Sequence, residues 1–506
     1  MEWKGEIMRK LECEAVVIAA GLSGLAATCA LAEQGVNVIT VEKSTVAGGA
    51  ANMGMQPLAI GTRQQREIAW DITPGEIFRY HANFVHWNVD MRLLRNYYFR
   101  SADTLEWIES MGVRFAHPEL SYPVPEAMRR YASPFPTAHS VLPEDGSAPA
   151  PRCAATMTKK MLEYAQEQGA EVLFETSATK ILKEDGAVCG IMAVDKTGEE
   201  IEIRSKAVIV CTGGAGDNPE MIKKEMGYEW GKDLFSFRIP GMNGEGMRMA
   251  WEAGAARTPL HMELMYQCPE NTSVWELDGG FRQPDLWVNK RGERFCDESG
   301  AINSTFMGTA IARQPGHFAL AVLDTAQIRK YKKNGPAMVD HVHGSAMFDN
   351  MEEVFQQYVD NGYQYAYKAD TLEELAEKAG INVQGFVRQV EEYNEMCENN
   401  YDELFEKDRR YMKPVKKAPF YAVKFFIGAY GTLGGIKINY KTEVVDEMDE
   451  PIPGLYAAGT DACDIFGDCY PFTLSGNTMG FCLNSGRMAG ENAAEYIQGS
   501  DEDFFS

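Results

Sequence analysis

Apolar and polar positions along residues 14–49 follow the order of a βαβ unit. A short apolar run, Glu14 to Ile18, leads into a glycine turn and then an Ala/Leu-rich helix. A second apolar run, Val36 to Val41, ends at the acidic Glu42. Units of this kind bind dinucleotides, because glycines let the backbone approach the pyrophosphate and the helix N-terminus presents unpaired N–H groups to it. The pattern predicts a dinucleotide-binding domain.

The glycine turn carries most of a dinucleotide fingerprint. Gly21 stands where the backbone approaches the pyrophosphate, and Gly24 stands where the helix packs closely on the strand. Ala19 occupies the place of the usual first glycine. Glu42 follows Gly21 by 21 residues, close to the ~20-residue offset at which a carboxylate meets ribose hydroxyls. We therefore expect dinucleotide binding, with a nucleotide-free packing unit as the alternative.

The segment after Glu42 distinguishes between dinucleotides. Residues 43–54 read KSTVAGGAANMG, which places the glycine pair Gly48 and Gly49 shortly after the acidic residue. NAD domains usually continue into another helix here. The arrangement instead resembles FAD proteins, which put small residues against the ribityl chain and the pyrophosphate. FAD is the favoured cofactor, and a glycine-rich surface loop is the alternative.

Hydrophobic periodicity divides the rest of the chain into helical and extended stretches. Four or five strands are expected over 169–211, with antiparallel pairs at the EDG and KTG turns and a final strand that ends at Thr212. A proline-rich excursion over 118–151 is typical of a loop that covers a site. Helices are expected at 74–80, 91–111, 156–168, 371–379, 384–399 and 476–497.

These blocks predict an α/β fold, with a Rossmann-like FAD domain of the two-dinucleotide-binding type and an inserted α+β cap domain. Residues 263–425 are richer in Asp, Glu, Lys and Tyr, and we assign them to the cap. Residues 1–262 and 426–506 are assigned to the two parts of the FAD domain. The second part is recognised by a strand that ends in a Gly-Thr-Asp turn at 459–461.

Charge and composition disfavour several classes of function. The formal net charge of −24 argues against nucleic acids and anionic membrane surfaces. No run approaches the ~20 apolar residues of a membrane span, and the N-terminus lacks a signal-type apolar region, so a cytoplasmic location is expected. The 11 cysteines form no CxxC pair, and the HVH at His341 and His343 is typical of a polar turn, so no metal site is predicted.

Four motifs in this order resemble the fumarate reductase/succinate dehydrogenase flavoprotein family: GLSGLAA…VEKSTVAGG, AVIVCTGG, VNKRGERFCDES and IPGLYAAGTD…GNTMG…SGRMAGENAA. The resemblance spans nearly the whole chain and implies FAD, a mobile cap and chemistry on a C–C bond beside an electron-withdrawing group. Ala50, Ala51 and Asn52 stand where some relatives link a histidine to the flavin, so the implied FAD is non-covalent. The implied FAD contacts are Gly21, Ser23, Gly24, Glu42, Lys43, Gly48, Gly49, Thr212, Gly213, Gly459, Asp461, Gly476 and Asn477.

The fumarate-type members of that family carry cationic or histidine side chains at substrate positions where this chain has neutral ones. The matching residues are Cys268, Ile302, Tyr430 and Thr473. A dicarboxylate needs bidentate cationic partners to offset its desolvation. Fumarate and succinate are therefore not expected as substrates. Arg282 and Arg294, in the cap, are expected to form structural ion pairs.

The C-terminal quarter resembles the 3-ketosteroid dehydrogenase branch through PFYAVKFFIGAYGTLGG and the later YP…GNTMG. Such chemistry moves a hydride between flavin N5 and the carbon β to a carbonyl, and exchanges a proton at the α carbon. A tyrosine hydroxyl serves either need, since it is a neutral donor with a pKa near ~10. We assign carbonyl polarisation to Tyr470 and the Gly476 N–H. Proton exchange is assigned to Tyr430 or Tyr266.

Three functions fit these observations. The first is an FAD-dependent oxidoreductase that reduces or forms a C=C bond conjugated to a carbonyl in a hydrophobic ketone or enone, such as a ketosteroid. The second acts on an unsaturated carboxylate, such as an aryl acrylate, held by Arg129, Arg130 and Arg152. The third is a non-catalytic electron-transfer flavoprotein. An enzyme of either kind binds a small molecule and needs a separate electron donor or acceptor, because the sequence shows no second nucleotide domain or cluster motif.

Overall fold

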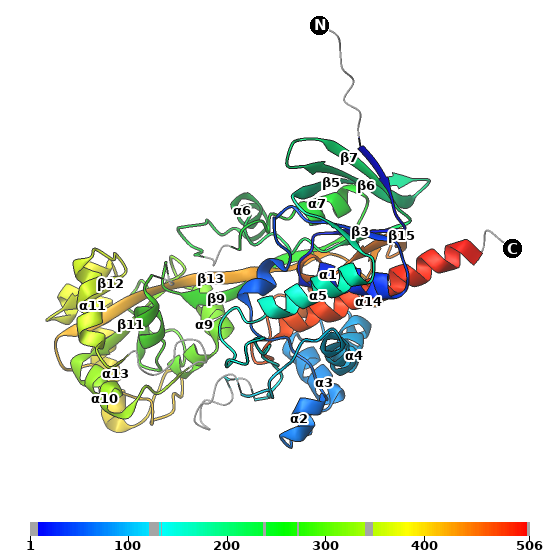
Figure 1. Cartoon of the computed structure of the whole chain (residues 1–506). Coiled ribbons are helices and arrows are strands. Elements are labelled where there is room, and N and C mark those ends of the chain that lie inside the picture. Colours follow the sequence, from blue (N-terminus) through cyan, green and yellow to red (C-terminus); the bar gives the residue numbers. More distant parts are fainter. Residues whose placement is uncertain are drawn as a thin grey trace, which may run out of the picture.

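The computed structural model describes residues 9–120, 131–132, 134–235, 239–270, 273–339 and 348–502. Four residues discussed above, Arg129, Arg130, His341 and His343, lie outside these ranges. Within the described part, no helix is both long and apolar enough to cross a membrane. Figure 1 shows the predicted α/β architecture, in which two long strands of a separate sheet lead from the helix-covered nucleotide lobe into a second lobe.

The dinucleotide unit lies at the centre of a six-stranded sheet. Its strand order is β14-β15-β8-β2-β3-β4, and β2 pairs in parallel with both β3 and β8. The chain therefore leaves β2 to one side and later returns to the other, which creates the switch point where open α/β sheets bind ligands. The bounds are β2 Ala15–Ile18, β3 Val38–Val41, β4 Glu171–Leu173, β8 Ala207–Val210, β14 Glu443–Val445 and β15 Pro451–Ala457.

Three helices pack together on this sheet: α1 (Leu22–Glu33), α5 (Ala155–Glu167) and α14 (Asn477–Glu502) (Figure 1). Glycines on α14 permit the close approach of α1, because a Cβ at Gly486 would lie 2.2 Å from the Ser23 carbonyl oxygen. The last helix in the described part of the chain is thus packed against the first, so segments from both ends of the sequence meet in this layer.

A second sheet contains four strands. Three of them, β5, β6 and β7, lie between β4 and β8 in the chain, and β1 precedes β2. Its order is β1-β7-β6-β5, with β1 Arg9–Glu12, β5 Thr176–Glu184, β6 Ala187–Asp195 and β7 Glu200–Arg204. The EDG turn joins β5 to β6, and both Asp185 and Gly186 adopt positive φ there. Positive φ at both central residues suits a tight hairpin, which explains the Asp-Gly pair.

The predicted cap contains a sheet ordered β10-β11-β13-β12, with β9 paired to β13. Figure 1 shows β13 as one long ribbon that joins this lobe to the nucleotide lobe. The proposed borders at 262/263 and 425/426 fall inside β9 and β13, so two continuous strands connect the lobes. The bounds are β9 Arg257–Gln267, β10 Leu286–Val288, β11 Phe318–Asp324, β12 Ala366–Ala369 and β13 Phe420–Ile436.

Several helices begin at residues whose side chains cap them, and α3 is an example. Thr73 accepts from the Glu76 backbone N–H and the Glu76 carboxylate accepts in return, while Pro74 opens α3 without a donor to satisfy. The remaining helices are α2 Arg63–Glu67, α3 Pro74–Phe84, α4 Met91–Ser110, α6 Pro219–Met226, α7 Glu245–Glu252, α8 Trp275–Gly280, α9 Ser304–Ala312, α10 Thr325–Asn334, α11 Met351–Asp360, α12 Leu372–Ala379 and α13 Val383–Asn399.

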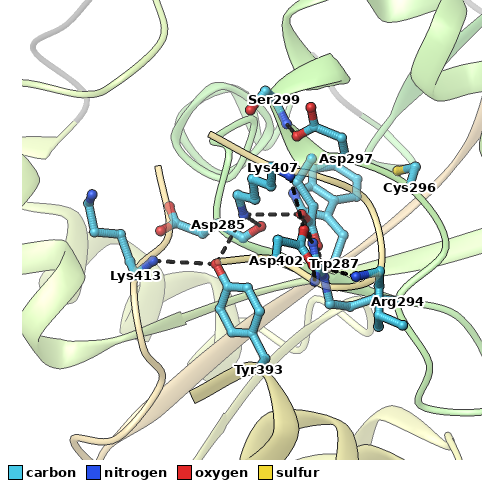
Figure 2. A network of polar contacts seen from close by, with 12 residues as sticks. Asp285, Trp287, Arg294, Cys296, Asp297, Ser299, Tyr393, Asp402, Lys407 and Lys413 are labelled. Atoms are coloured by element: carbon cyan, nitrogen blue, oxygen red, sulfur yellow. Dashed lines mark hydrogen bonds and ion pairs between the residues drawn. The ribbon is translucent and has the colours of Figure 1, made fainter. Parts of the chain in front are cut away.

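A buried ion network lies within the cap (Figure 2). Arg294 donates two hydrogen bonds to Asp402, at 2.9 and 2.8 Å, and two to Glu298, at 2.7 and 2.8 Å. The Lys407 Nζ lies 3.0 Å from Glu298 and donates to the Tyr393 hydroxyl at 3.0 Å. All four charged side chains are fully buried, and two positive charges face two negative ones. Arg294 is therefore a structural ion-pair residue, as the sequence predicted.

Candidate active site

A cavity of about 670 Å³ lies at the C-terminal ends of β2, β3 and β8. Ala19, Glu42 and Cys211, the residues that directly follow these three strands, all line it. The cavity continues from the dinucleotide unit toward the junction with the cap, where Glu263 and Tyr430 form part of the wall. It therefore extends from the predicted nucleotide site to the region assigned to the substrate.

The N-terminus of α1 faces the dinucleotide end of the cavity. Gly21 caps the helix and forms an isolated parallel bridge with Gly48, which brings the glycine pair against the turn. The first turn of α1 contains no acidic side chain. Its unpaired N–H groups are thus available to an anion such as a pyrophosphate.

Glu42 holds the same turn in place. Its Oε2 accepts from the Ala20 N–H at 2.8 Å, and its Oε1 accepts from the Ser44 N–H at 2.7 Å. A carboxylate oxygen has two lone pairs, so these bonds leave acceptor capacity for ribose hydroxyls. Lys43 also lines the cavity, but its ammonium is 2.5 Å from both the Gly241 carbonyl oxygen and Glu245.

The missing first glycine has a structural consequence. Ala19 adopts φ 80°, a left-handed conformation that glycine tolerates and alanine does not favour. Helix α1 approaches this turn closely at Gly24, five residues after Ala19. A Cβ at Gly24 would lie 1.9 Å from the Ala19 carbonyl oxygen. Gly24 is therefore required for helix–strand packing, while Ala19 keeps a strained backbone in the place of a glycine.

A second turn at the cavity is fixed by Asp461. This fully buried carboxylate accepts from the backbone N–H groups of Thr212, Gly213 and Gly214 and from the Thr212 hydroxyl. Thr212 and Gly213 line the cavity, whereas Asp461 does not. Asp461 thus shapes the wall through the turn that it holds.

The sequence-predicted FAD residues fall into two groups. Those that line the cavity are Gly21, Ser23, Glu42, Lys43, Gly49, Thr212, Gly213 and Gly476. Those that shape it from behind are Gly24, Gly48, Gly459, Asp461 and Asn477. A glycine-lined wall, an acid-free helix N-terminus and a carboxylate after β3 together match the needs of a dinucleotide, so the residues present fit FAD.

The wall near the cap is built around a β-bulge. Met262 pairs with Thr432 and Leu264 with Ala429, so Glu263 on β9 faces two residues of β13, Tyr430 and Gly431. Both bulge residues and Glu263 line the cavity. Bulges often re-aim side chains beside active sites. This one places Tyr430, which is 41% exposed, in the cavity wall across from a buried carboxyl group.

Tyr470 lies in the same region. It is 6% exposed, lines the cavity and packs edge-to-face on Phe466. Its hydroxyl oxygen accepts from the Thr478 N–H at 3.0 Å, and burial raises its pKa well above that of an ordinary tyrosine. Gly476, at φ 82°, lines the cavity on the same loop. The structure thus brings Tyr430, Tyr470 and Gly476 together.

Tyr266 is not part of this group. Its hydroxyl donates to the Ala301 carbonyl oxygen at 2.6 Å, and its ring packs edge-to-face on Trp287 and Phe425. It is fully buried in the cap core and does not line the cavity. The physical reason is strand alternation, because residues three apart on one strand point to opposite faces. Glu263 faces the cavity, so Tyr266 faces away.

Glu263 was missed by the sequence reasoning. It is 7% exposed, and burial raises its pKa to about 8, an effect that the neighbouring Thr478 side chain partly opposes. The segment MELMYQ gives no motif around it, and its position opposite the bulge depends on a strand pairing between residues more than 160 apart. No signal in the sequence alone identified it.

Cys268 and Thr473, which by resemblance stand at substrate positions, are engaged in contacts within the protein. Cys268 is fully buried, and its backbone N–H donates to Asp278 at 2.7 Å. The Thr473 hydroxyl accepts from the Tyr80 hydroxyl at 2.9 Å. Arg282 is bound to Asp278 at 2.6 Å and therefore belongs to a buried ion pair, as predicted. Among the described residues that line the cavity there is no arginine or histidine.

Comparison with known proteins places this geometry in context. The model of the FAD binding domain family matches residues 14–478. A vinyl phenol reductase of Lactiplantibacillus plantarum is 30% identical over 496 residues, covering 95% of this chain and 96% of that protein. A fumarate reductase (cytochrome) of Shewanella frigidimarina is 25% identical, covering 96% and 77%. A 3-oxosteroid 1-dehydrogenase of Mycolicibacterium smegmatis is 28% identical over 366 residues, covering 64% and 59%.

Solved structures share the fold. The 3-ketosteroid Δ1-dehydrogenase from Sterolibacterium denitrificans is similar with a TM-score of 0.76 at 19% identity, covering 96% of this chain and 99% of that one. The open conformation of a flavocytochrome c3 fumarate reductase gives a TM-score of 0.69 at 24% identity, covering 96% and 79%. These likenesses establish the Rossmann-like architecture that the sequence predicted.

Proposed function

This chain belongs to the FAD binding domain family, and we propose that it reduces or forms a C=C bond conjugated to an oxygen-bearing group in a neutral, hydrophobic substrate. The family match and the relatives identify it as an FAD-dependent oxidoreductase that acts on CH–CH groups. Enones, ketosteroids and vinylic phenols are the substrate classes of this kind. The ketosteroid and vinyl phenol enzymes among the relatives support them.

One observation carries the proposal: the described cavity wall near the cap has no cationic side chain. Its apolar part includes Met55, Met242 and Phe472, and its polar part includes Tyr430 and Tyr470. A buried carboxylate substrate without a cationic partner loses several kcal/mol through desolvation. A neutral ketone or phenol loses far less and needs only hydrogen-bond donors.

Bound FAD would supply the hydride acceptor or donor. The N-terminus of α1 and Glu42 would hold its pyrophosphate and ribose, and Asp461 would fix the adjacent turn. At the other end, the Tyr470 hydroxyl still has its own proton to donate after it accepts from Thr478. We assign to it the polarisation of the substrate oxygen, together with the Gly476 N–H. Such a donor is worth roughly 10²–10³ in rate when it faces developing charge.

The experiment is an anaerobic titration of the purified flavoprotein. The flavin is reduced chemically, and its reoxidation is followed by absorbance after addition of enones, ketosteroids, a vinylphenol, fumarate or an aryl acrylate. We expect the neutral substrates to reoxidise the flavin and the carboxylates to be inactive. Tyr470→Phe should slow reoxidation at least tenfold. The control is Tyr456→Phe, which removes the hydroxyl of another buried tyrosine, one that donates to the Asn492 carbonyl oxygen, and it should leave the rate unchanged.

Two other results would redirect the interpretation. Reoxidation by carboxylates alone would favour the unsaturated-acid hypothesis, although Arg152 is not among the residues that line the cavity. Inactivity with every compound, despite bound FAD, would favour an electron-transfer flavoprotein. The separate electron donor or acceptor expected from the sequence stays a proposal, and mixing the reduced protein with small carriers tests it.

A further inference from the structure

Glu263 is a buried carboxyl group in the cavity for which the proposed function has no role. It lies on β9 opposite the Tyr430–Gly431 bulge, so it reaches the cavity at the junction of the nucleotide lobe and the cap. Thr478, whose side chain neighbours this carboxyl group, follows Asn477, the first residue of α14, and donates its backbone N–H to Tyr470. The carboxyl group is therefore placed between two elements that line the reacting end of the cavity.

The surroundings of Glu263 keep it neutral without a cation. The titratable groups near it are Tyr430 across the bulge, Tyr470 on the loop, Cys463 after the 3₁₀ turn and Cys482 on α14. Burial raises the pKa of Tyr470, Cys463 and Cys482, so these groups are uncharged below pH 8. Because no charge partner holds the carboxylate, burial also raises the pKa of Glu263 itself to about 8.

We propose that Glu263 is the proton donor for the substrate carbon during C=C reduction, and the base that removes the same proton during dehydrogenation. This inference rests on the proposed function. In the reductive direction, the Glu263 carboxyl group gives its proton to one alkene carbon, while the other carbon would receive the hydride that bound, reduced FAD supplies. The C=C π bond is lost, two C–H bonds form, and the flavin is oxidised. The resulting carboxylate regains a proton from solvent.

Glu263 suits this role better than the tyrosines do. Proton transfer is most efficient when the pKa of the acid lies near the working pH. Burial raises the pKa of Glu263 from its ordinary acidic value to about 8, close to neutral pH. Burial also raises the pKa of Tyr470, which starts above neutral pH and therefore moves further from it. Tyr470 then serves as a hydrogen-bond donor that keeps its proton, while Glu263 gives its proton up. This division of roles replaces the assignment of proton exchange to Tyr430 or Tyr266.

The first test measures protonation without catalysis. Glu263→Gln mimics the neutral acid, so it removes the cost of burying a charge. Because the folded-state pKa lies above the ordinary value, wild-type stability is fully present at low pH and falls as the pH rises toward 8. The thermal midpoint of the Glu263→Gln holoenzyme, relative to wild type, should therefore increase between pH 5 and 8 and then level off. Glu202→Gln, a control that is 6% exposed but paired with Arg204, should not show this rise.

The second test is single-turnover reoxidation of the reduced flavin by the best neutral substrate. For wild type we expect the rate to fall about tenfold per pH unit above pH 8, as the donor ionises. Glu263→Gln should be at least roughly a hundredfold slower at pH 7, with little dependence on pH. Glu263→Asp keeps an acid and should retain the pH dependence at a reduced rate. In the dehydrogenation direction, the wild-type rate should instead rise with pH.

The outcomes separate this proposal from the proposed function. If Glu263→Gln keeps the wild-type rate and pH profile, Glu263 is not the proton donor, while the proposed function stands. A thermal midpoint difference that does not change with pH would also overturn the proposal, because Glu263 would then be charged or exposed. If no neutral substrate reoxidises the wild-type flavin, the proposed function fails and this proposal fails with it.

Discussion

Ala19→Gly should stabilise the protein. Ala19 adopts φ 80° in the turn that precedes α1. An L-residue in the left-handed region costs about 1–2 kcal/mol, and glycine does not bear this cost. Glycine also loses more backbone entropy on folding than alanine does, and this loss lowers the free energy of unfolding by about 0.5–1 kcal/mol. The difference predicts a net increase of about 0.5–1 kcal/mol in the free energy of unfolding, measured by urea denaturation of the FAD-free and FAD-bound protein.

The neighbouring alanine provides the matched control. Ala20 is fully buried and is not among the described residues with positive φ. Ala20→Gly should therefore lower the free energy of unfolding by about 1 kcal/mol or more, because it increases the backbone entropy of the unfolded chain and removes a buried methyl group. If Ala19→Gly destabilises the protein as Ala20→Gly does, the left-handed strain at Ala19 is not real and the reasoning fails.

Three further substitutions test the architecture of the site and the cap. Gly24→Ala should prevent retention of FAD, because its Cβ would lie 1.9 Å from a backbone oxygen; gel filtration with flavin absorbance measures this, and a yellow, folded variant would contradict it. Asp461→Asn should cost about 1–3 kcal/mol in thermal or urea unfolding, since an amide cannot accept from every backbone N–H of the 212–214 turn. Arg294→Met should cost about 3–5 kcal/mol by leaving Asp402 and Glu298 buried beside a single cation, and a further Asp402→Leu should recover part of that loss.

The nucleotide end of the site was predictable because its chemistry is local in the sequence. A strand, a glycine turn, a helix and a second strand lie within residues 14–42, and each part positions the next. The spacing of Gly21, Gly24 and Glu42 therefore mapped directly onto the cavity wall or its support. The role of Asp461 was less accessible, because its partners at 212–214 lie more than 240 residues away and engage it through their backbone.

The reacting end was harder to predict for a definite physical reason. Its residues meet through the pairing of β9 with β13, where a bulge decides which side chains reach the cavity. A one-residue difference in register changes the face to which a side chain points. Sequence reasoning therefore selected Tyr266, whose hydroxyl is bound within the cap core, and missed Glu263, three residues earlier on the same strand.

On the proposed function, the cavity achieves selectivity by staying neutral. The four positions matched by resemblance to substrate residues of fumarate-type proteins, Cys268, Ile302, Tyr430 and Thr473, have neutral side chains here, and burial keeps the acid at residue 263 protonated below about pH 8. Reduction of a conjugated alkene places transient negative charge on the substrate oxygen, and neutral donors such as Tyr470 stabilise that charge as it forms. A carboxylate substrate brings its charge in the ground state, where no cation in the described wall near the cap offsets its desolvation. Each 1.4 kcal/mol of that cost corresponds to a tenfold preference for the neutral substrate. Above pH 8 the ionised Glu263 would repel the same developing charge, so the reductive rate and the discrimination against carboxylates share one titrating group.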